Sequence, residues 1–282
     1  MTEKKTYTQY YEQEEVLSQI EKFNDKNLLI EEIIFDDEGA QMHKTINEYN
    51  EQDKISHTIQ YDENDDLIED KEIFFKEGEE EIYSITHFPD GSLTKEIRER
   101  SENRLLIKWI DEDDEFEGSE ERILTDEGLT KQLTQINFTN KITALYEYEY
   151  DEKGQMIKAV EKDERKKFLK AYAFTYDDNG NKIVEEELNK KGKITNRVIH
   201  QYEDNRIVKT KAAEGDMLYH YDDNQNLIKE EKFNPDGSAN IILYIYDDAK
   251  QLIQEKHYDI PQGNETHEDF LQKQIRYEQI IK

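Results

Sequence analysis

The stretch YEYEYDEKGQMIKAVEKDERKKFLKAYAFTYDDNGNK, residues 146–182, contains one pattern twice. In each copy aromatic residues alternate with other residues, and a Tyr-Asp pair is followed by Gly three residues after the Asp, at 154 and 180. Alternation with period two is typical of a β-strand. Asp followed by Gly is typical of a tight turn, because Asp hydrogen-bonds its own backbone and Gly accepts a positive φ. This stretch therefore predicts strands joined by short polar turns.

The eleven glycines extend the pattern along the chain. Their ten separations are 39, 13, 27, 10, 26, 26, 12, 23, 22 and 26 residues, and seven of these lie within one residue of a multiple of thirteen. Scattered glycines would rarely do this, so Gly marks one repeated structural event. Related turns follow Phe35, Tyr61, Phe88, Leu188, Tyr202, Tyr221, Phe233 and Tyr246.

These repeats predict an all-β fold. Strands that are close in sequence pair as hairpins, so we expect an elongated or coiled antiparallel β-meander of about twenty short strands, built from strand-turn repeats of about 13 residues. An aromatic stripe along one strand face would be buried by curling, by folding over or by a partner. Residues 12–22 and 163–170 also permit a helix on propensity alone, but both stretches lie where the repeat expects strand, turn and strand.

Charge suggests how the chain is divided. In a meander, successive turns fall on opposite edges, so the turns that start at 150, 176 and 202 share an acidic edge. The other edge carries Lys162, Arg165, Lys166, Lys167, Lys190, Lys191 and Lys193. The acidic turns at 35, 61 and 112 have the opposite parity, which implies a slip of the meander. We therefore expect an N-terminal β-repeat region over 1–110, an irregular acidic joint over 111–140, and a C-terminal Tyr-Asp-type β-repeat region over 141–282.

Composition restricts the class of protein and its partners. Of 282 residues 34% are hydrophobic and 38% are charged, and the mean hydropathy is -1.07, which is too polar for a thick core. The 18 Tyr and 11 Phe argue against disorder. Lys and Arg total 38 against 68 Asp and Glu, a net charge of -30 that repels nucleic acid and anionic lipid and favours a cationic partner. We find no apolar run of membrane-spanning length or signal-peptide core, and expect a cytoplasmic protein without membrane insertion.

Motifs of catalysis and metal binding are absent from the sequence. There is no Cys, no zinc motif among the seven His, no Gly-rich phosphate loop and no nucleophile elbow. His57 and His200 lie on strand faces with apolar or aromatic residues, which indicates packing. The run Asp111, Asp113, Glu115 resembles a calcium loop until Phe116 replaces the required Gly. We expect no enzyme, catalytic residue, metal or cofactor, while adventitious calcium at Asp-rich turns and stacking of sugar or peptide on Tyr remain alternatives.

Tyr-Asp-x-x-Gly followed by an aliphatic residue, with Asp-Gly turns half a period later, resembles the YD repeat of RHS proteins and the related MORN-variant repeats of small antitoxin-like proteins. The resemblance is clearest over 148–258 and implies a β-repeat architecture. RHS shells are much longer, and Pro89, Pro235 and Pro261 do not follow Asp, so no Asp-Pro-x-Gly autoproteolysis-like motif is present. The resemblance therefore implies a small partner or immunity protein rather than a toxin-enclosing shell.

These arguments lead to a functional expectation. We expect a non-enzymatic protein-binding repeat module, an immunity or antitoxin-like protein that neutralises a cationic effector, with no nucleic-acid partner. The alternative is a structural scaffold or secretion-associated repeat protein. The expected partner-binding residues are the acidic turn residues Asp177, Asp178, Asp222, Asp223, Asp247 and Asp248. The sequence leaves the oligomeric state open.

Overall fold

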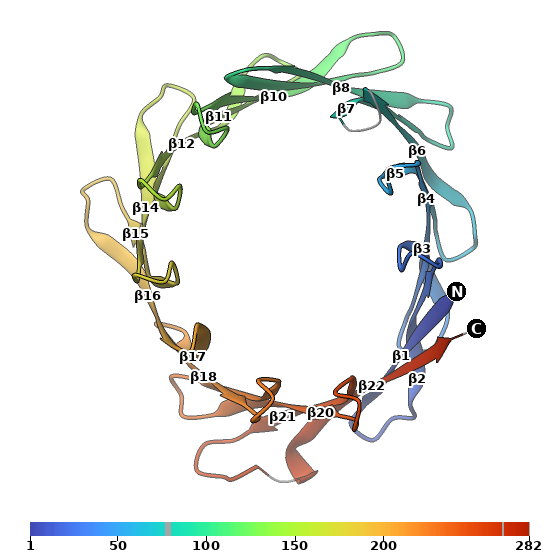
Figure 1. Ribbon diagram of the computed structural model, residues 1–282, viewed down its shortest axis with the longest axis vertical. Coiled ribbons are helices and arrows are strands. Elements are labelled where there is room, and N and C mark those ends of the chain that lie inside the picture. Colours follow the sequence, from blue (N-terminus) through green and yellow to red (C-terminus); the bar gives the residue numbers. More distant parts are fainter. Residues whose placement is uncertain (77–79, 267, 282) are drawn as a thin grey trace. The chain divides into compact units, whose positions relative to one another are not determined.

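The computed structural model describes residues 1–76, 80–266 and 268–281, so one of the eleven glycines, Gly78, and one of the seven histidines, His267, lie outside it. Within these residues the chain forms 22 β-strands and one short 3-10 helix (Figure 1). The first eleven strands are β1 (Thr2–Tyr10), β2 (Val16–Phe23), β3 (Leu29–Phe35), β4 (Gln41–Tyr49), β5 (Ile55–Tyr61), β6 (Leu67–Lys76), β7 (Glu80–His87), β8 (Leu93–Ser101), β9 (Arg104–Ile110), β10 (Phe116–Leu124) and β11 (Thr130–Asn137). The others are β12 (Ile142–Tyr150), β13 (Met156–Lys162), β14 (Phe168–Tyr176), β15 (Lys182–Leu188), β16 (Ile194–Glu203), β17 (Arg206–Ala212), β18 (Gly215–Tyr221), β19 (Leu227–Phe233), β20 (Ala239–Tyr246), β21 (Leu252–Ile260) and β22 (Leu271–Ile281), with the helix η1 (Glu268–Phe270) before β22.

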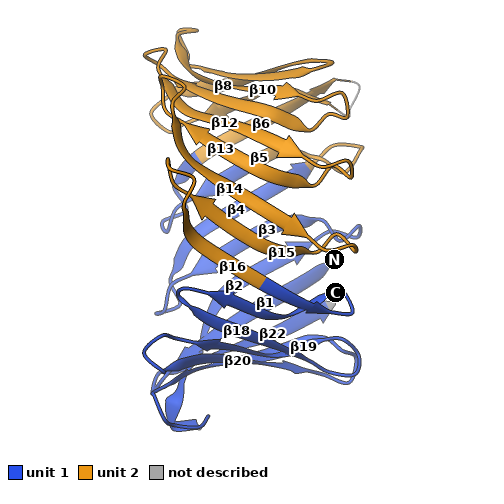
Figure 2. Ribbon diagram, turned by 90° about the vertical axis from the view of Figure 1, so that its left-hand side faces the viewer, with its two compact units in different colours: residues 1–48, 59–68, 200–282 blue, residues 49–58, 69–199 orange. Residues whose placement is uncertain are grey.

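The chain divides into two compact units (Figure 2). Unit 1 comprises residues 1–48, 59–68 and 200–282, and unit 2 comprises 49–58 and 69–199. These divisions differ from the expected boundaries at 110 and 141. Residues 111–140, for which we expected an irregular joint, contain β10 and β11, and each of these strands pairs with its neighbour on both sides.

Within each unit, strands that follow one another in sequence pair antiparallel. In unit 2 this pairing continues from β7 to β15 without interruption. Within unit 2 the acidic turn 111–115 therefore lies on the opposite edge from the acidic turns 151–155 and 177–181 without any slip of the strands. The helix alternatives are wrong, because β2 occupies most of 12–22 and 163–167 is the turn before β14.

The sheet does not have the open ends of the expected elongated or coiled meander, so that expectation is wrong. In unit 1, strand β1 pairs with β2 on one side and with β22 on the other, from Thr2 opposite Ile281 to Tyr10 opposite Lys273 (Figure 1). The first and last strands of the 22-stranded sheet are thus neighbours, and the strand order is closed. Closure pairs the backbone N–H and C=O groups that open edge strands would expose. Arg276 supports the junction, since its side chain hydrogen-bonds Glu15 at 2.9 and 2.8 Å and lies over the ring of Tyr7.

One hydrogen-bond pattern recurs at the turns. Asp151 donates its N–H to the carbonyl of Gln155 at 2.9 Å, and Gly154, with φ of 78°, donates to the carbonyl of Asp151 at 3.1 Å. The Oδ1 atom of Asp151 accepts the N–H groups of Lys153 and Gln155, each at 2.9 Å. The first residue of the turn accepts the same two backbone bonds at Asn24, Asp36, Asn50, Asp62, Asp111, Asn137, Asp163, Asn189 and Asp222. Asp and Asn thus satisfy turn amides that would otherwise need water.

The Tyr of the Tyr-Asp pair has a different role. The Tyr150 hydroxyl donates to the Thr130 carbonyl at 2.7 Å, and the Tyr176 hydroxyl donates to the Met156 carbonyl at 2.8 Å. In both cases the acceptor begins the strand after the preceding turn on the same edge of the sheet. In unit 1 the hydroxyls of Tyr221 and Tyr246 donate in the same way to Ile207 and Leu227. The Asp therefore organises its own turn, while the Tyr attaches that turn to the hairpin before it.

The apolar interior is thin. Tyr146 faces Glu161 and Tyr172 faces Glu187 across strand pairs, so aromatic and charged side chains share one face instead of occupying opposite faces. These two Tyr side chains are half-buried. The hydrophobic residues that are buried are Phe23, Leu106, Ile107, Leu124, Leu145, Ala159, Val160, Ala171, Ile241, Tyr258 and Ile260. Backbone pairing must therefore contribute a large part of the order of this sheet.

Replacing Tyr150 and Tyr176 with Phe tests the tyrosine links. Each substitution keeps the ring but leaves a strand carbonyl without its hydroxyl donor, so we expect each to lower the free energy of unfolding by about 1 kcal/mol. Tyr148→Phe is the matched control, because the Tyr148 hydroxyl makes no hydrogen bond within the part of the chain that the structure describes. Urea unfolding measures the difference. Equal stability of all three variants and the wild type would show that the hydroxyl bonds of Tyr150 and Tyr176 do not stabilise the repeat.

Candidate protein-binding surface

The structure places all six predicted Asp residues in turns. Asp177 and Asp178 belong to the β14–β15 turn of unit 2, whereas the pairs at 222–223 and 247–248 belong to the β18–β19 and β20–β21 turns of unit 1. These two turns of unit 1 lie on the same edge of the sheet, with the β19–β20 turn on the opposite edge. The bond from the Tyr246 hydroxyl to Leu227 connects them. The structure thus brings four of the six residues together within unit 1.

The two residues of each Asp pair have different structural roles. The Oδ1 and Oδ2 atoms of Asp177 accept the backbone and side-chain N–H groups of Asn181 at 2.8 and 3.0 Å. Asp222 binds Asn226 at the same two distances, and Asp247 accepts the backbone N–H of Gln251 at 2.9 Å. The second residues Asp178, Asp223 and Asp248 are exposed. The first Asp therefore maintains the turn, and the second presents a carboxylate to solvent.

Hydrogen bonding within these turns affects ionisation. The Asn181 side chain, followed by the backbone amides of the turn, lowers the pKa of Asp177. The Asn226 side chain and the amides of its turn lower the pKa of Asp222 in the same way. A hydrogen bond to the charged form favours that form, so both carboxylates stay ionised to lower pH than an unbonded Asp.

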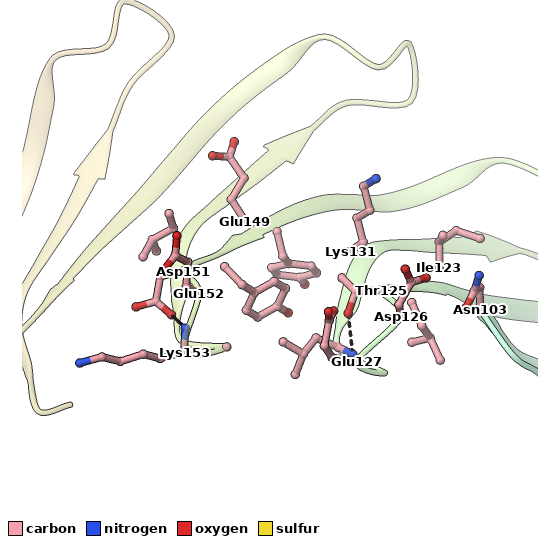
Figure 3. A pocket seen from close by; sticks show the side chains of 16 residues that line it. Asn103, Ile123, Thr125, Asp126, Glu127, Lys131, Glu149, Asp151, Glu152 and Lys153 are labelled. Atoms are coloured by element: carbon pink, nitrogen blue, oxygen red, sulfur yellow. Dashed lines mark hydrogen bonds between the residues drawn. The ribbon is translucent and has the colours of Figure 1, made fainter. Parts of the chain in front are cut away.

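A groove lies between two neighbouring turns of unit 2. The turns 125–129 and 151–155 border a hollow of about 1120 Å³ (Figure 3). Its floor includes the buried Leu124 and the half-buried Leu129 and Tyr148. The charged residues that line it are Asp126, Glu127, Glu149, Asp151 and Glu152, against Lys131 and Lys153. With five carboxylates and two ammonium groups, the groove is acidic over an apolar floor.

Three of these carboxylates are available to a ligand. Glu149 pairs with Lys158 at 2.7 Å, and Asp151 accepts the amides of its own turn. Asp126, Glu127 and Glu152 are exposed and make no ion pair or hydrogen bond within the described residues. Figure 3 shows Asp126 and Glu127 on one side of the groove and Glu152 on the other. The sequence analysis did not select Asp126 or Glu127, although turns 26 residues apart on one edge had to be neighbours.

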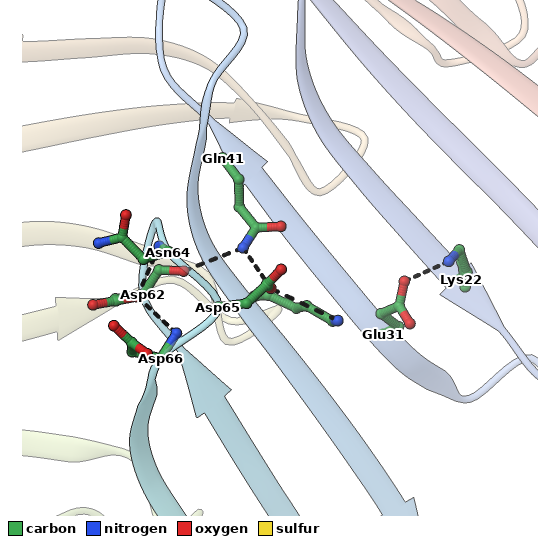
Figure 4. A network of polar contacts seen from close by, with 8 residues as sticks. Lys22, Glu31, Gln41, Asp62, Asn64, Asp65 and Asp66 are labelled. Atoms are coloured by element: carbon green, nitrogen blue, oxygen red, sulfur yellow. Dashed lines mark hydrogen bonds and ion pairs between the residues drawn. The ribbon is translucent and has the colours of Figure 1, made fainter. Parts of the chain in front are cut away.

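Further side-chain bonds fix the spacing of neighbouring turns. In unit 2, Gln155 Nε2 donates to the Gly180 carbonyl at 3.1 Å, so the 151–155 turn also holds the next turn of its edge. In unit 1, Gln41 Nε2 donates to the Asp62 carbonyl at 3.2 Å and to Asp65 Oδ1 at 2.9 Å (Figure 4). These bonds join neighbouring turns on one edge of unit 2 and on one edge of unit 1, and they restrict the separation of the carboxylates on those turns.

The other sequence hypotheses concern metals and membranes. Asp111 accepts the amides of its own turn, and Asp114 pairs with Lys95 at 2.7 Å. Among the described residues, no group of three or more His, Asp or Glu is arranged to hold a metal ion. Over the same residues, no helix has the length and apolar character needed to cross a membrane. His57 Nε2 lies 2.6 Å from Asp70 Oδ1, and His200 Nδ1 lies 3.0 Å from Thr210 Oγ1, so both also make polar contacts.

Comparison with known proteins gives no family for this chain. No family model matches, and no curated protein matches. The chain is similar at 10% identity to the Photorhabdus luminescens Tc holotoxin pore (TM-score 0.30) and to the TcdB2-TccC3-Cdc42 complex (TM-score 0.31), covering 86% and 90% of this chain. It spans 18% and 19% of those chains. A porin-like protein from Bacteroides uniformis is also 10% identical, with a TM-score of 0.33 and coverage of 99% of this chain and 97% of that one. The chain's own series of strands and turns shows a β fold of the repeat type.

The turn carboxylates predict a pH dependence of stability. Folding lowers the pKa values of Asp177 and Asp222. Their contribution to the free energy of unfolding is therefore fully present above the unfolded pKa and is lost as the pH falls through the folded pKa. We expect the Asp177→Asn, Asp222→Asn variant to show a shallower fall of melting temperature between about pH 6 and pH 3 than the wild type. Asn holds the same turn position at 24, 50, 137 and 189, so the variant should fold.

The matched control replaces Asp178 and Asp223 with Asn, which removes one charge beside each of the same turns. Its acid profile should follow the wild type, because these exposed residues are the second members of the pairs. An equal flattening in both variants would assign the effect to general charge repulsion and contradict the role of the turn bonds.

Proposed function

We propose that this chain is a non-enzymatic protein-binding repeat module that holds a cationic segment of its partner in the acidic groove of unit 2. One observation carries the proposal: Asp126, Glu127 and Glu152 surround an apolar floor and have no cationic partner of their own within the described residues. Carboxylates without a cationic partner form their strongest hydrogen bonds with a ligand that supplies positive charge.

Lys and Arg side chains suit both parts of the groove. Their aliphatic stems pack on apolar surface while the charged heads stay at a polar rim. Here the stem would lie on Leu129 and Tyr148, and the head would meet Asp126, Glu127 or Glu152. The net charge of -30 adds a long-range field that accelerates encounter with a cationic protein and disfavours nucleic acid and anionic membranes.

The finer form of the proposal is an immunity or antitoxin-like protein of the RHS/YD-repeat type that neutralises a cationic effector in the cytoplasm. The Tyr-Asp turns and the acidic charge support it. The second candidate is a structural scaffold or a secretion-associated repeat protein. The bond from Gln155 to Gly180 supports this candidate, because it holds two neighbouring turns of one edge together.

A pull-down from the native host tests the proposal. The bait is the wild-type chain, compared with the groove variant Asp126→Asn, Glu127→Gln, Glu152→Gln. We expect one dominant partner whose binding falls with salt and is weakened about tenfold in the groove variant, because three carboxylates facing its cations are lost.

The control carries the same change of charge elsewhere in unit 2. Glu112→Gln, Asp113→Asn, Glu115→Gln alters the exposed β9–β10 turn, on the edge opposite the groove. It should bind like the wild type. If both variants lose the partner equally, net charge and not the groove determines binding. A partner that binds all three baits independently of salt would refute the groove as the site.

A further inference from the structure

Unit 2 carries two basic turns on the edge opposite the groove. They are the β13–β14 turn, 163–167, and the β15–β16 turn, 189–193. Their cationic residues are Arg165, Lys166, Lys167, Lys190, Lys191 and Lys193, all exposed, against the two anionic residues Asp163 and Glu164. In a chain with a net charge of -30, this is a local reversal of sign.

The two basic turns lie side by side. Lys190 of one turn acts with Lys167 of the other to lower the pKa of Asp163, after the larger effect of the Lys167 backbone amide. Ion pairing neutralises few of these cations, since Arg165 approaches Glu164 only to 3.8 Å and both side chains are more than half exposed. The Lys side chains of 190, 191 and 193 make no ion pair within the described part of unit 2. They form a compact cationic surface that is complementary in charge to an anionic surface of a partner.

The acidic turns of the same unit match this surface in spacing as well as in sign. Successive turns on one edge are two strands apart, about 10 Å on either edge, because both edges belong to one sheet. Two basic turns can therefore face two acidic turns, 151–155 and 177–181, at the same separation. A polyanion of unrelated structure has no reason to present carboxylates at this interval, whereas a second copy of this chain necessarily does.

We infer that the basic turns bind the acidic turns 151–155 and 177–181 of a second copy of this chain. The inference rests on the proposed function in one respect, because Glu152 belongs both to these acidic turns and to the groove. Such a contact leaves the acidic turns of one copy and the basic turns of the other unused, so association is not limited to two copies. At physiological salt the Debye length is about 8 Å, so facing turns attract while the repulsion between whole chains is screened.

Charge reversal on each edge tests this inference. The first variant, Arg165→Glu, Lys190→Glu, Lys191→Glu, makes both edges acidic. The second variant, Glu152→Lys, Asp178→Lys, reverses the charge of the exposed carboxylate in each of the two acidic turns. All five positions are exposed, and none is the first residue of its turn. Circular dichroism checks that each variant keeps its β-structure.

Sedimentation velocity then measures association. We expect the wild type to form dimers and larger species at physiological salt, and fewer of them as the salt concentration is raised further. Each variant alone should stay monomeric, and an equimolar mixture of the two should associate again. A wild type that is monomeric at every concentration and salt, or a mixture that stays monomeric while the wild type associates, would overturn the inference. The first variant keeps the groove intact, so its retention of the pulled-down partner tests the proposed function separately.

Discussion

Hydrogen bonds between the first side chain of a turn and its own backbone are the interaction on which the rest of this structure depends. Strand side chains alternate between faces, so a slip of one residue would exchange the two faces of a strand. A large core would resist such a slip, but few hydrophobic residues here are buried. The carboxylate of Asp151, or the amide of Asn189 at the same position, fixes where each strand ends and the next begins. Register is therefore set at the turns.

The strands and turns could be predicted because their causes are local. The Tyr-Asp-x-x-Gly pattern at 150–154 contains the aromatic link, the side-chain acceptor and the positive φ that the turn requires. Closure could not be predicted, because β1 and β22 carry the same alternation as strands that pair only with sequence neighbours. Gly118 also obscured the spacing. It lies within β10, where a Cβ atom would stand 2.9 Å from the Ile136 carbonyl, and marks no turn.

In the candidate site, too, the features with a local cause could be predicted and those that depend on strand pairing could not. Asp177 and Asp222 were predictable as turn residues, but nothing in the sequence separates their structural role from that of the exposed Asp178 and Asp223. Asp126 and Glu127 were not selected, because no Tyr-Asp pair marks their turn. There Thr125 takes the position of the Asp and accepts the Leu129 amide at 3.2 Å. A groove formed by two turns depends on which turns are neighbours, and that follows from strand pairing and not from either turn alone.

The pairing of β1 with β22 has a consequence for the connectivity of the chain. Thr2 lies opposite Ile281, so the backbone at the two ends is already adjacent. Within unit 1 both strands at the ends therefore have two neighbours, β1 between β2 and β22, and β22 between β21 and β1. A circular permutant, with the present ends joined by a short linker and new ends opened in the two-residue turn 213–214, would retain the pairing of β1 with β22 and that of β17 with β18. In this architecture the order of synthesis and the order in space are separable.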